Sequence, residues 1–311
     1  MNINAYFYDI KSKLRSVIRI ISTTKNFYCP LLVYFNLIKK CNAVLFDRSR
    51  VEVSKETWGD YWNRITLLYL KKKLRFRIED YFVIFNFKGK ELRFKIPEIP
   101  SEIESSAIKI LENFYSEPYR FLNVKNKIVI DVGAYIGDTS VYFALKGAQK
   151  VIAIEPHPYI FELLKVNVDI NNLEKIIIPI NAGLSDRRGK VPVRASVIDT
   201  WGLRLDDCIA YTSDKSDNVR LVPLITLHDV LIKIHEHDEL VLKIDCEGCE
   251  YNILLKHDHE LKKFDEIILE YHGEPNTLIR ALAKAGFKAK AVIQYKEKLG
   301  LIHAKRVTKG C

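Results

Sequence analysis

From Lys127 to the end of the chain, short runs of apolar residues alternate with stretches of helical periodicity. A nearly continuous apolar run is typical of a strand whose two faces are both covered by helices. Alternating strands and helices predict right-handed βαβ units and a mostly parallel sheet. The runs expected to form this sheet are Ile128–Val132, Val151–Glu155, Ile176–Asn181, Leu240–Asp245 and Glu266–Glu270.

Two further apolar runs, Lys288–Gln294 and Leu299–Lys305, flank a short polar turn and predict a closing hairpin. A long polar stretch, Arg187–Asn218, lies between the third and fourth strands of the expected parallel sheet. Loops of this length are usually functional. We therefore expect this stretch, which carries Trp201 and Arg204, to line a substrate pocket.

Before residue 120 the pattern has a different character. Residues 73–97 alternate apolar and polar positions on either side of Lys88-Gly89-Lys90, which predicts a β-hairpin. The segment Glu102–Tyr115 has apolar residues on one helical face and predicts a helix. We expect two domains: an N-terminal helical region with a β-hairpin at 1–120, and an α/β domain at 121–311.

Residues 1–47 predict one or two amphipathic helices, in which basic residues alternate with aromatic ones. Such helices either pack on a protein core or lie on an anionic membrane surface. Packing is favoured, and contact with a membrane stays open. The longest apolar stretch, 27–46, is interrupted by a proline and two lysines, so we expect no transmembrane segment.

Composition narrows the class of protein. The 311 residues are 48% hydrophobic and 28% charged, which is typical of a globular protein and not of a disordered or disulfide-rich chain. The net charge of +10 favours an anionic partner, but without an RNA-recognition signature nucleic acid is a minority option. Six irregularly spaced cysteines, without an apparent secretory leader, predict reduced thiols and a cytoplasmic location.

The strongest local motif is a buried strand that breaks into a glycine turn and then a helix, at 130–140. Glycine lets the backbone approach a nucleoside cofactor, and Asp131 at the strand end can orient the loop or pair with a cationic amino group. The spacing D-x-G-x-x-x-G differs from the G-x-G-x-x-G of dinucleotide loops, which argues against a dinucleotide oxidoreductase. The residues expected to bind the cofactor here are Asp131, Gly133, Ala134, Tyr135, Gly137 and Thr139.

An acid at the end of the next strand is the usual partner of ribose hydroxyls, and Glu155, followed by Pro156, occupies that place. Asn181 and Ala182 follow the third strand, where they either border the adenine or form a plain turn. Both interpretations of this pair stay open.

Acids and a histidine follow the fourth and fifth strands. Asp245 and Glu247 lie in the sequence Asp245-Cys246-Glu247-Gly248-Cys249, and His272 ends a strand. Because the carboxyl ends of parallel strands meet at one edge, these residues should converge with Asp131 and Glu155 on one crevice. Without a second cysteine pair, we interpret the C-x-x-C as packing and expect no metal site.

Five motifs occur in the order DVGAYIGDTS, IEPHP, LITLHDV, KIDCEGCE and LEYH, and they resemble the FkbM family of methyltransferases. The resemblance covers about residues 120–290. It implies a class I methyltransferase fold: a Rossmann-like, mostly parallel sheet with a closing antiparallel hairpin, here preceded by a small α+β N-terminal region. It also implies S-adenosyl-L-methionine as methyl donor and O-methylation of a sugar, glycolipid or other small molecule. Asp245 then falls in the family's acidic motif and has a second role in cofactor binding.

A hydroxyl needs its proton accepted as it is methylated, and the candidates are Asp245, Glu247 and His272. His272 is favoured as the base, because the unperturbed pKa of histidine, about 6.5, suits that work. Two alternatives stay open. One is methylation of RNA or protein, and the other is a nucleoside-binding or membrane-docked partner protein without turnover.

Overall fold

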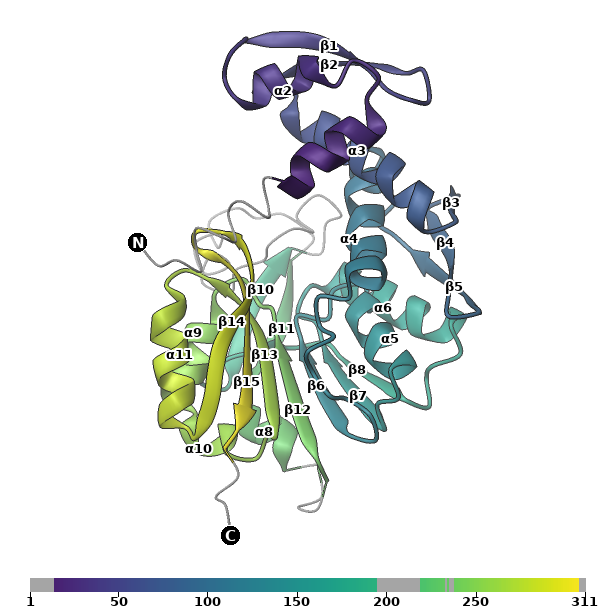
Figure 1. The fold of residues 1–311 in the computed structure, drawn as a ribbon. Coiled ribbons are helices and arrows are strands. Elements are labelled where there is room, and N and C mark those ends of the chain that lie inside the picture. Colours follow the sequence, from purple (N-terminus) through teal and green to yellow (C-terminus); the bar gives the residue numbers. More distant parts are fainter. Residues whose placement is uncertain (1–13, 195–218, 233, 235–237, 308–311) are drawn as a thin grey trace. The chain divides into compact units, whose positions relative to one another are not determined.

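The computed structural model describes residues 14–194, 219–232, 234 and 238–307. The chain divides into two compact units, which are drawn in Figure 1. The first comprises Met1–Leu92 and Pro100–Ser116, and the second comprises Arg93–Ile99 and Glu117–Cys311. The second unit holds every residue that the sequence assigned to a functional site.

A seven-stranded sheet organises the second unit, in the order β14-β15-β13-β12-β6-β7-β8. The five strands from β13 to β8 in this order run parallel to one another. Strand β15 pairs antiparallel with both β13 and β14. The strands are β6 (Ile128–Val132), β7 (Lys150–Ile154), β8 (Ile177–Ile180), β12 (Leu240–Ile244), β13 (Glu266–His272), β14 (Phe287–Lys296) and β15 (Leu299–Arg306). The predicted parallel strands and closing hairpin are confirmed.

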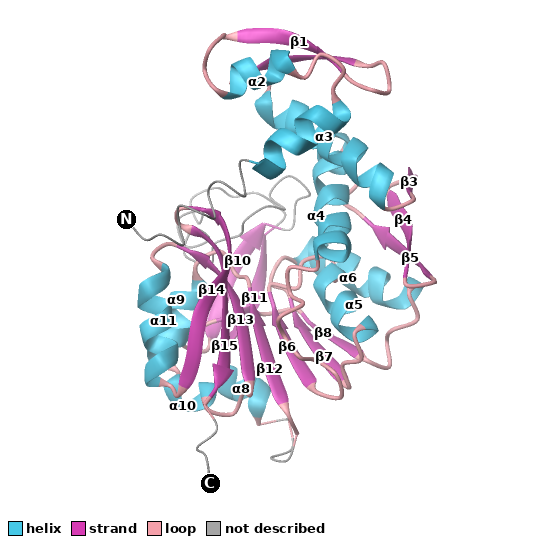
Figure 2. Cartoon of the chain, in the orientation of Figure 1, coloured by secondary structure: helices cyan, strands magenta, loops and turns pink. Residues whose placement is uncertain are grey.

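Helices cover both faces of this sheet, with α9 and α11 on one side and α5 and α6 on the other (Figures 1 and 2). Branched residues of the central strands, such as Ile130, Leu242 and Ile267, are completely buried in one cluster with residues of α8 to α11. This two-sided cover explains why the strands appear in the sequence as continuous apolar runs. The helices are α5 (Asp138–Leu145), α6 (Pro158–Ile170), α8 (Leu227–Leu231), α9 (Cys249–Lys256), α10 (Asp258–Leu261) and α11 (Pro275–Lys284).

A small second sheet corrects the interpretation of Arg187–Asn218 as a polar insertion. Its strands are β9 (Gly183–Leu184), β10 (Gly189–Arg194) and β11 (Val219–Ile225), in the order β10-β11-β9. Val191 and Val193 of β10 are buried against Val222. The alternation of valine with polar residues in Gly189–Arg194 is the pattern of a half-buried strand. Trp201 and Arg204 lie outside the described residues, so their expected place in a pocket stays a prediction.

The chain before residue 117 contains the predicted hairpin and helix, and more strands than the sequence predicted; the second strand of the hairpin continues past Leu92, where the first unit ends. β4 (Phe82–Phe87) and β5 (Lys90–Lys95) flank the Lys88-Gly89 turn, and β3 (Phe76–Glu79) adds a third strand. The predicted helix is α4 (Ile103–Ser116), preceded by the short η1 (Pro100–Glu102). The other elements are a helical segment at 14–23, α2 (Tyr28–Tyr34), α3 (Trp58–Lys73) and a hairpin of β1 (Lys40–Val44) and β2 (Arg50–Ser54).

Two disulfides contradict the expectation of reduced thiols. One joins Cys29 of α2 to Cys41 of β1, and the other joins Cys246 to Cys249. Irregular spacing concealed the first pair, because its partners become neighbours only when β1 folds back against α2. Within the described residues, none of the helices combines the length and apolarity needed to cross a bilayer.

Candidate active site

The glycine turn after β6 is fixed by its contact with the end of β12. Gly133 has a φ of 71°, and a Cβ atom there would lie 1.7 Å from the backbone oxygen of Asp245. The amides of Gly133 and Ala134 both donate to the carbonyl of Ile154, at 3.0 and 3.1 Å. Glycine is therefore required at 133 because two strand ends approach each other closely. Gly137, with a φ of 90°, precedes the first turn of α5.

Asp131 is completely buried and holds the start of α5. Its Oδ2 accepts hydrogen bonds from the hydroxyls of Thr139 and Ser140, at 2.7 and 2.6 Å. Its Oδ1 lies 3.0 Å from the ammonium group of Lys243, which is equally buried. Asp131 thus contacts both the start of the loop helix and a cationic amino group, that of Lys243, and its role in cofactor binding stays a prediction.

Lys243 ties the two strand ends together. Besides the ion pair with Asp131, its ammonium group donates to the carbonyls of Val132 and Gly133, at 3.1 and 2.7 Å. Burial lowers the pKa of this lysine, but the charges of Asp131 and Asp245 outweigh burial and hold the pKa above its ordinary value. The ammonium group stays charged, and it fixes the carbonyl oxygens that begin the glycine turn.

Glu155 lies at the end of β7, beside the same turn. One carboxylate oxygen accepts from the amide of Tyr135 at 3.0 Å, and the other accepts from the amide of His157 at 2.8 Å. Burial is the largest influence on its pKa and raises it to about 7. The Asn181 amide donates to the carbonyls of Glu155 and Pro156, at 2.9 and 3.1 Å, and Ala182 beside it is buried. The predicted ribose and adenine residues thus lie together, and their ligand roles stay predictions.

The acidic motif after β12 forms a tight turn before α9. Glu247 has a φ of 54° and Gly248 one of 118°, so the backbone reverses within two residues. The disulfide between Cys246 and Cys249 closes this turn. The Glu247 side chain remains 45% exposed, which leaves its carboxylate accessible from solvent.

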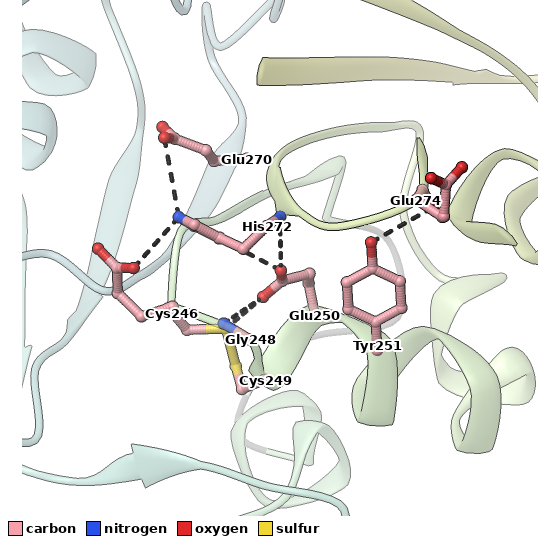
Figure 3. A network of polar contacts seen from close by, with 9 residues as sticks. Cys246, Gly248, Cys249, Glu250, Tyr251, Glu270, His272 and Glu274 are labelled. Carbon is pink, nitrogen blue, oxygen red and sulfur yellow. Dashed lines mark hydrogen bonds and ion pairs between the residues drawn. A yellow bond between two sulfur atoms is a disulfide. The ribbon is translucent and has the colours of Figure 1, made fainter. Parts of the chain in front are cut away.

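His272 at the end of β13 is held between two glutamates (Figure 3). Glu250 is completely buried, and its Oε1 lies 3.1 Å from the amide nitrogen and 3.3 Å from Nδ1 of His272. The Oε2 of Glu250 accepts from the amide of Gly248 at 2.8 Å. On the other side of the ring, Nε2 lies 3.3 Å from Glu247 and 3.9 Å from Glu270. Glu250 therefore fixes the ring with Nε2 directed at a group of acids.

Asp245, Glu270 and His272 each present a ligand atom within 4.8 Å of the other two. The strand register explains this. Ile244 pairs with Leu269, so that Asp245 comes opposite Glu270, and His272 lies two residues further on the same face of β13. Burial, and then the charge of Asp245, raise the pKa of Glu270 to about 8.

The charges around His272 bear on its predicted role as base. Burial lowers its pKa, but the hydrogen bond to Glu250 and the charge of Glu247 outweigh burial and raise the pKa to about 9. The ring is then protonated near neutral pH, where it donates protons and does not accept them. This arrangement favours a carboxylate of the cluster as the proton acceptor, while the role of His272 stays a prediction.

Sequence reasoning missed two residues of the site, Lys243 and Glu250, and placed Glu270 at the sheet edge without giving it a role. The lysine was readable as the single charge inside an apolar strand, Leu240–Ile244. Glu270 was readable from the E-x-H spacing, because alternate residues of a strand face the same side. No sequence signal pairs Glu250 with His272, since their contact depends on how α9 packs beside β13.

Residues 131–295, just over half of the chain, match the family described as Methyltransferase FkbM domain. The chain belongs to this family. The resemblance drawn from the five motifs is thereby confirmed. The strand order and the antiparallel β15 are those of the class I methyltransferase fold predicted with it, and S-adenosylmethionine, the predicted cofactor, is the methyl donor that this assignment implies.

The curated relatives are also methyltransferases. Methyltransferase sdnD of Sordaria araneosa is 28% identical over 182 residues, which are 57% of this chain and 61% of that protein. A putative protein N5-glutamine methyltransferase of Methanocaldococcus jannaschii is 33% identical over 91 residues, 29% of this chain and 42% of that protein. The chain thus matches less than two thirds of the length of either relative.

The chain resembles solved structures of methyltransferases only with low scores. The M. jannaschii TYW2 structure, a complex with AdoMet, has a TM-score of 0.38 and 16% identity, covering 74% of this chain and 89% of that one. The M. jannaschii tRNA m1G37 methyltransferase has a TM-score of 0.40 and 17% identity, covering 74% and 59%. The strand order, and not these scores, carries the assignment of the fold.

Proposed function

We propose that this protein transfers a methyl group from S-adenosylmethionine to a hydroxyl oxygen of a sugar, glycolipid or other small-molecule acceptor. The observation that carries the proposal is the cluster of Asp245, Glu270 and His272 at the strand ends, directly beside the glycine turn. The contact between Gly133 and the Asp245 backbone joins the two features. Groups able to take a proton are therefore adjacent to the expected cofactor loop.

The chemistry needs little more than alignment and a proton acceptor. The sulfonium of the donor is already activated, so holding acceptor oxygen, methyl carbon and sulfur in line supplies much of the rate. As the new C–O bond forms and the C–S bond breaks, the hydroxyl proton passes to a base, and S-adenosylhomocysteine leaves as a neutral thioether. A positioned base contributes about 10²–10⁴-fold. Asp245 and Glu247 are the carboxylates we assign to this role.

RNA or protein methylation remains the second candidate, on one specific observation. Short regions of this chain match a protein N5-glutamine methyltransferase and, at 46% identity over 63 residues, a tRNA (guanine(37)-N(1))-methyltransferase of M. jannaschii. The net charge of +10 suits an RNA partner. The acidic cluster favours the hydroxyl acceptor, because the carboxylates of Asp245 and Glu247 repel a phosphate backbone.

Calorimetry with S-adenosylmethionine and with NAD separates the cofactor classes. We expect the protein to bind S-adenosylmethionine alone, and Glu155→Gln to weaken binding at least tenfold. The matched control is Glu162→Gln, an exposed glutamate on α6 whose substitution should leave binding unchanged. Binding of NAD, or of neither ligand, would refute the proposal.

Production of S-adenosylhomocysteine then separates the acceptors. Saccharides, glycolipids, bulk RNA and protein extracts are each incubated with the enzyme, and thioether formation is followed by mass spectrometry. Turnover with RNA that falls steeply with salt would replace the small-molecule proposal with the RNA one. Cofactor binding without turnover on any acceptor class would favour a binding protein without catalysis.

A further inference from the structure

We propose that Asp245, Glu270 and His272 bind a divalent cation, with Nε2 of His272 and one oxygen of each carboxylate as ligands. The three ligand atoms lie within 4.8 Å of one another, so small side-chain movements would bring all three to a single ion. They come from the ends of two adjacent strands, so a rigid part of the sheet fixes their positions.

The contacts of His272 are those of a metal ligand. A histidine that binds a metal through one nitrogen usually donates its other N–H to a carboxylate, which fixes the tautomer and the ring plane. Glu250 supplies that carboxylate at Nδ1 and is itself held by the amide of Gly248. Because Glu250 is completely buried while Glu247 is half exposed, the two sides of the ring differ (Figure 3). The buried side orients the ring, and the accessible side carries Nε2, where a cation would replace the contact with Glu247.

The balance of charge gives an independent reason for a cation. Four carboxyl groups, those of Asp245, Glu247, Glu250 and Glu270, surround one imidazole. Lys243, whose charge also acts on Glu270, is already paired with Asp131. Acids gathered in a half-buried site repel one another unless protons or a cation are shared between them. A divalent ion at the ligand atoms would take the place of the protons that Glu270 and His272 otherwise hold.

The donor set indicates the class of ion. One imidazole and two carboxylates suit a first-row divalent cation of the Mn²⁺ type, which accepts both nitrogen and oxygen ligands. Three protein ligands leave coordination positions open for water or for an acceptor hydroxyl. In this role, which rests on the proposed function, Asp245 would hold the ion, and Glu247 would remain as the base that takes the proton. The ion would bind the acceptor oxygen, lower the pKa of its hydroxyl and direct it to the methyl group.

Electron paramagnetic resonance with Mn²⁺ tests the site in the full chain without cofactor or acceptor. We expect one Mn²⁺ per chain and a ¹⁴N coupling from the imidazole. Asp245→Asn, Glu270→Gln and His272→Gln should each weaken binding at least tenfold. Glu250→Gln, at a residue that orients His272 and is not itself a ligand, should weaken binding about 10–100-fold. The matched control is His303→Gln, because His303 also contacts a buried glutamate, Glu266, at the opposite end of β13, and Mn²⁺ affinity should not change.

The wild-type spectrum protects the test against variants that fail to fold. Absence of bound Mn²⁺, or bound Mn²⁺ without ¹⁴N coupling, would overturn the metal site. Displacement of Mn²⁺ by saturating S-adenosylmethionine would also overturn it, because the same carboxylates would then hold the cofactor. Methyl transfer that proceeds unchanged in a chelator would overturn the role of the metal in the reaction and leave the proposed function intact. Metal binding without any methyl transfer would instead support the metal site and refute the proposed function.

Discussion

The ammonium group of Lys243 lies 3.0 Å from the carboxylate of Asp131, and both side chains are fully buried in the sheet. The two residues are direct partners in the parallel register of β12 and β6. Each also anchors backbone or hydroxyl groups at the carboxyl ends of the strands. The pair therefore fixes the geometry of the glycine turn from within the two strands, β6 and β12, that meet there.

Removing one partner should be far more damaging than removing both. Lys243→Met leaves a buried carboxylate without its cation, which costs about 3–5 kcal/mol of unfolding free energy. The measurement is urea unfolding followed by circular dichroism. The double variant Asp131→Asn with Lys243→Met removes both charges and should recover part of that loss. A double variant less stable than Lys243→Met would contradict this coupling.

Gly133 should not tolerate even a methyl group. A Cβ atom there would lie 1.7 Å from the backbone oxygen of Asp245, so Gly133→Ala must separate β6 from β12 at the site. We expect a loss of more than tenfold in S-adenosylmethionine affinity together with a lower melting temperature. Gly59→Ala is the control, because Gly59 lies in α3 with open space around it. That substitution should raise stability by about 0.5–1 kcal/mol.

Most of the sheet could be predicted because its signal is local. A strand covered by helices on both faces, such as Ile128–Val132, needs apolar residues at nearly every position, and such a run is visible in the sequence. The limits of this strand in the structure match the prediction. The hairpin of β1 and β2 lacked such a signal. Arg50–Ser54 instead alternates valine with polar residues, which is the weaker signal of a half-buried strand, and its valines pack in a cluster with residues of α3.

The candidate site was predicted in position but not in its contacts. Strand ends converge by topology, so Asp245 and His272 could be brought together from their places in the sequence. Ion pairs depend on side-chain direction, and nothing local indicated that Asp131 binds a lysine. The disulfide between Cys246 and Cys249 was missed because a C-x-x-C spacing is equally compatible with packing, a metal or a disulfide.

Stability should fall as the pH rises from about 6.5 to 9. His272 has a folded pKa of about 9 against an unperturbed value of 6.5, so its protonated form is favoured by folding. That stability is fully present below pH 6.5 and is lost as the pH passes the folded pKa. Glu270, with a pKa of about 8, acts in the same direction, because folding favours its protonated form. Thermal melts in a chelator at a series of pH values provide the measurement.

Glu250→Gln identifies the source of this pH dependence. The substitution removes the charge beside Nδ1, which should move the pKa of His272 back towards its ordinary value. The imidazole resonances followed by NMR titration report that shift directly. The part of the loss in unfolding free energy that is due to His272 should then end at a lower pH than in the wild type. If the His272 titration is the same in the variant and the wild type, Glu250 is not the cause.

The disulfide between Cys29 and Cys41 should stabilise the first unit. It closes a loop with a sequence separation of 12, and a loop of that size restricts the unfolded chain by about 3 kcal/mol in the chain-entropy account. We expect Cys29→Ser with Cys41→Ser to unfold at lower urea concentration by about that amount. The matched control is Cys246→Ser with Cys249→Ser. That disulfide spans only 3 positions, so its loss should cost less stability and act on the turn that carries Glu247. Equal losses in the two double variants would show that loop closure is not the reason.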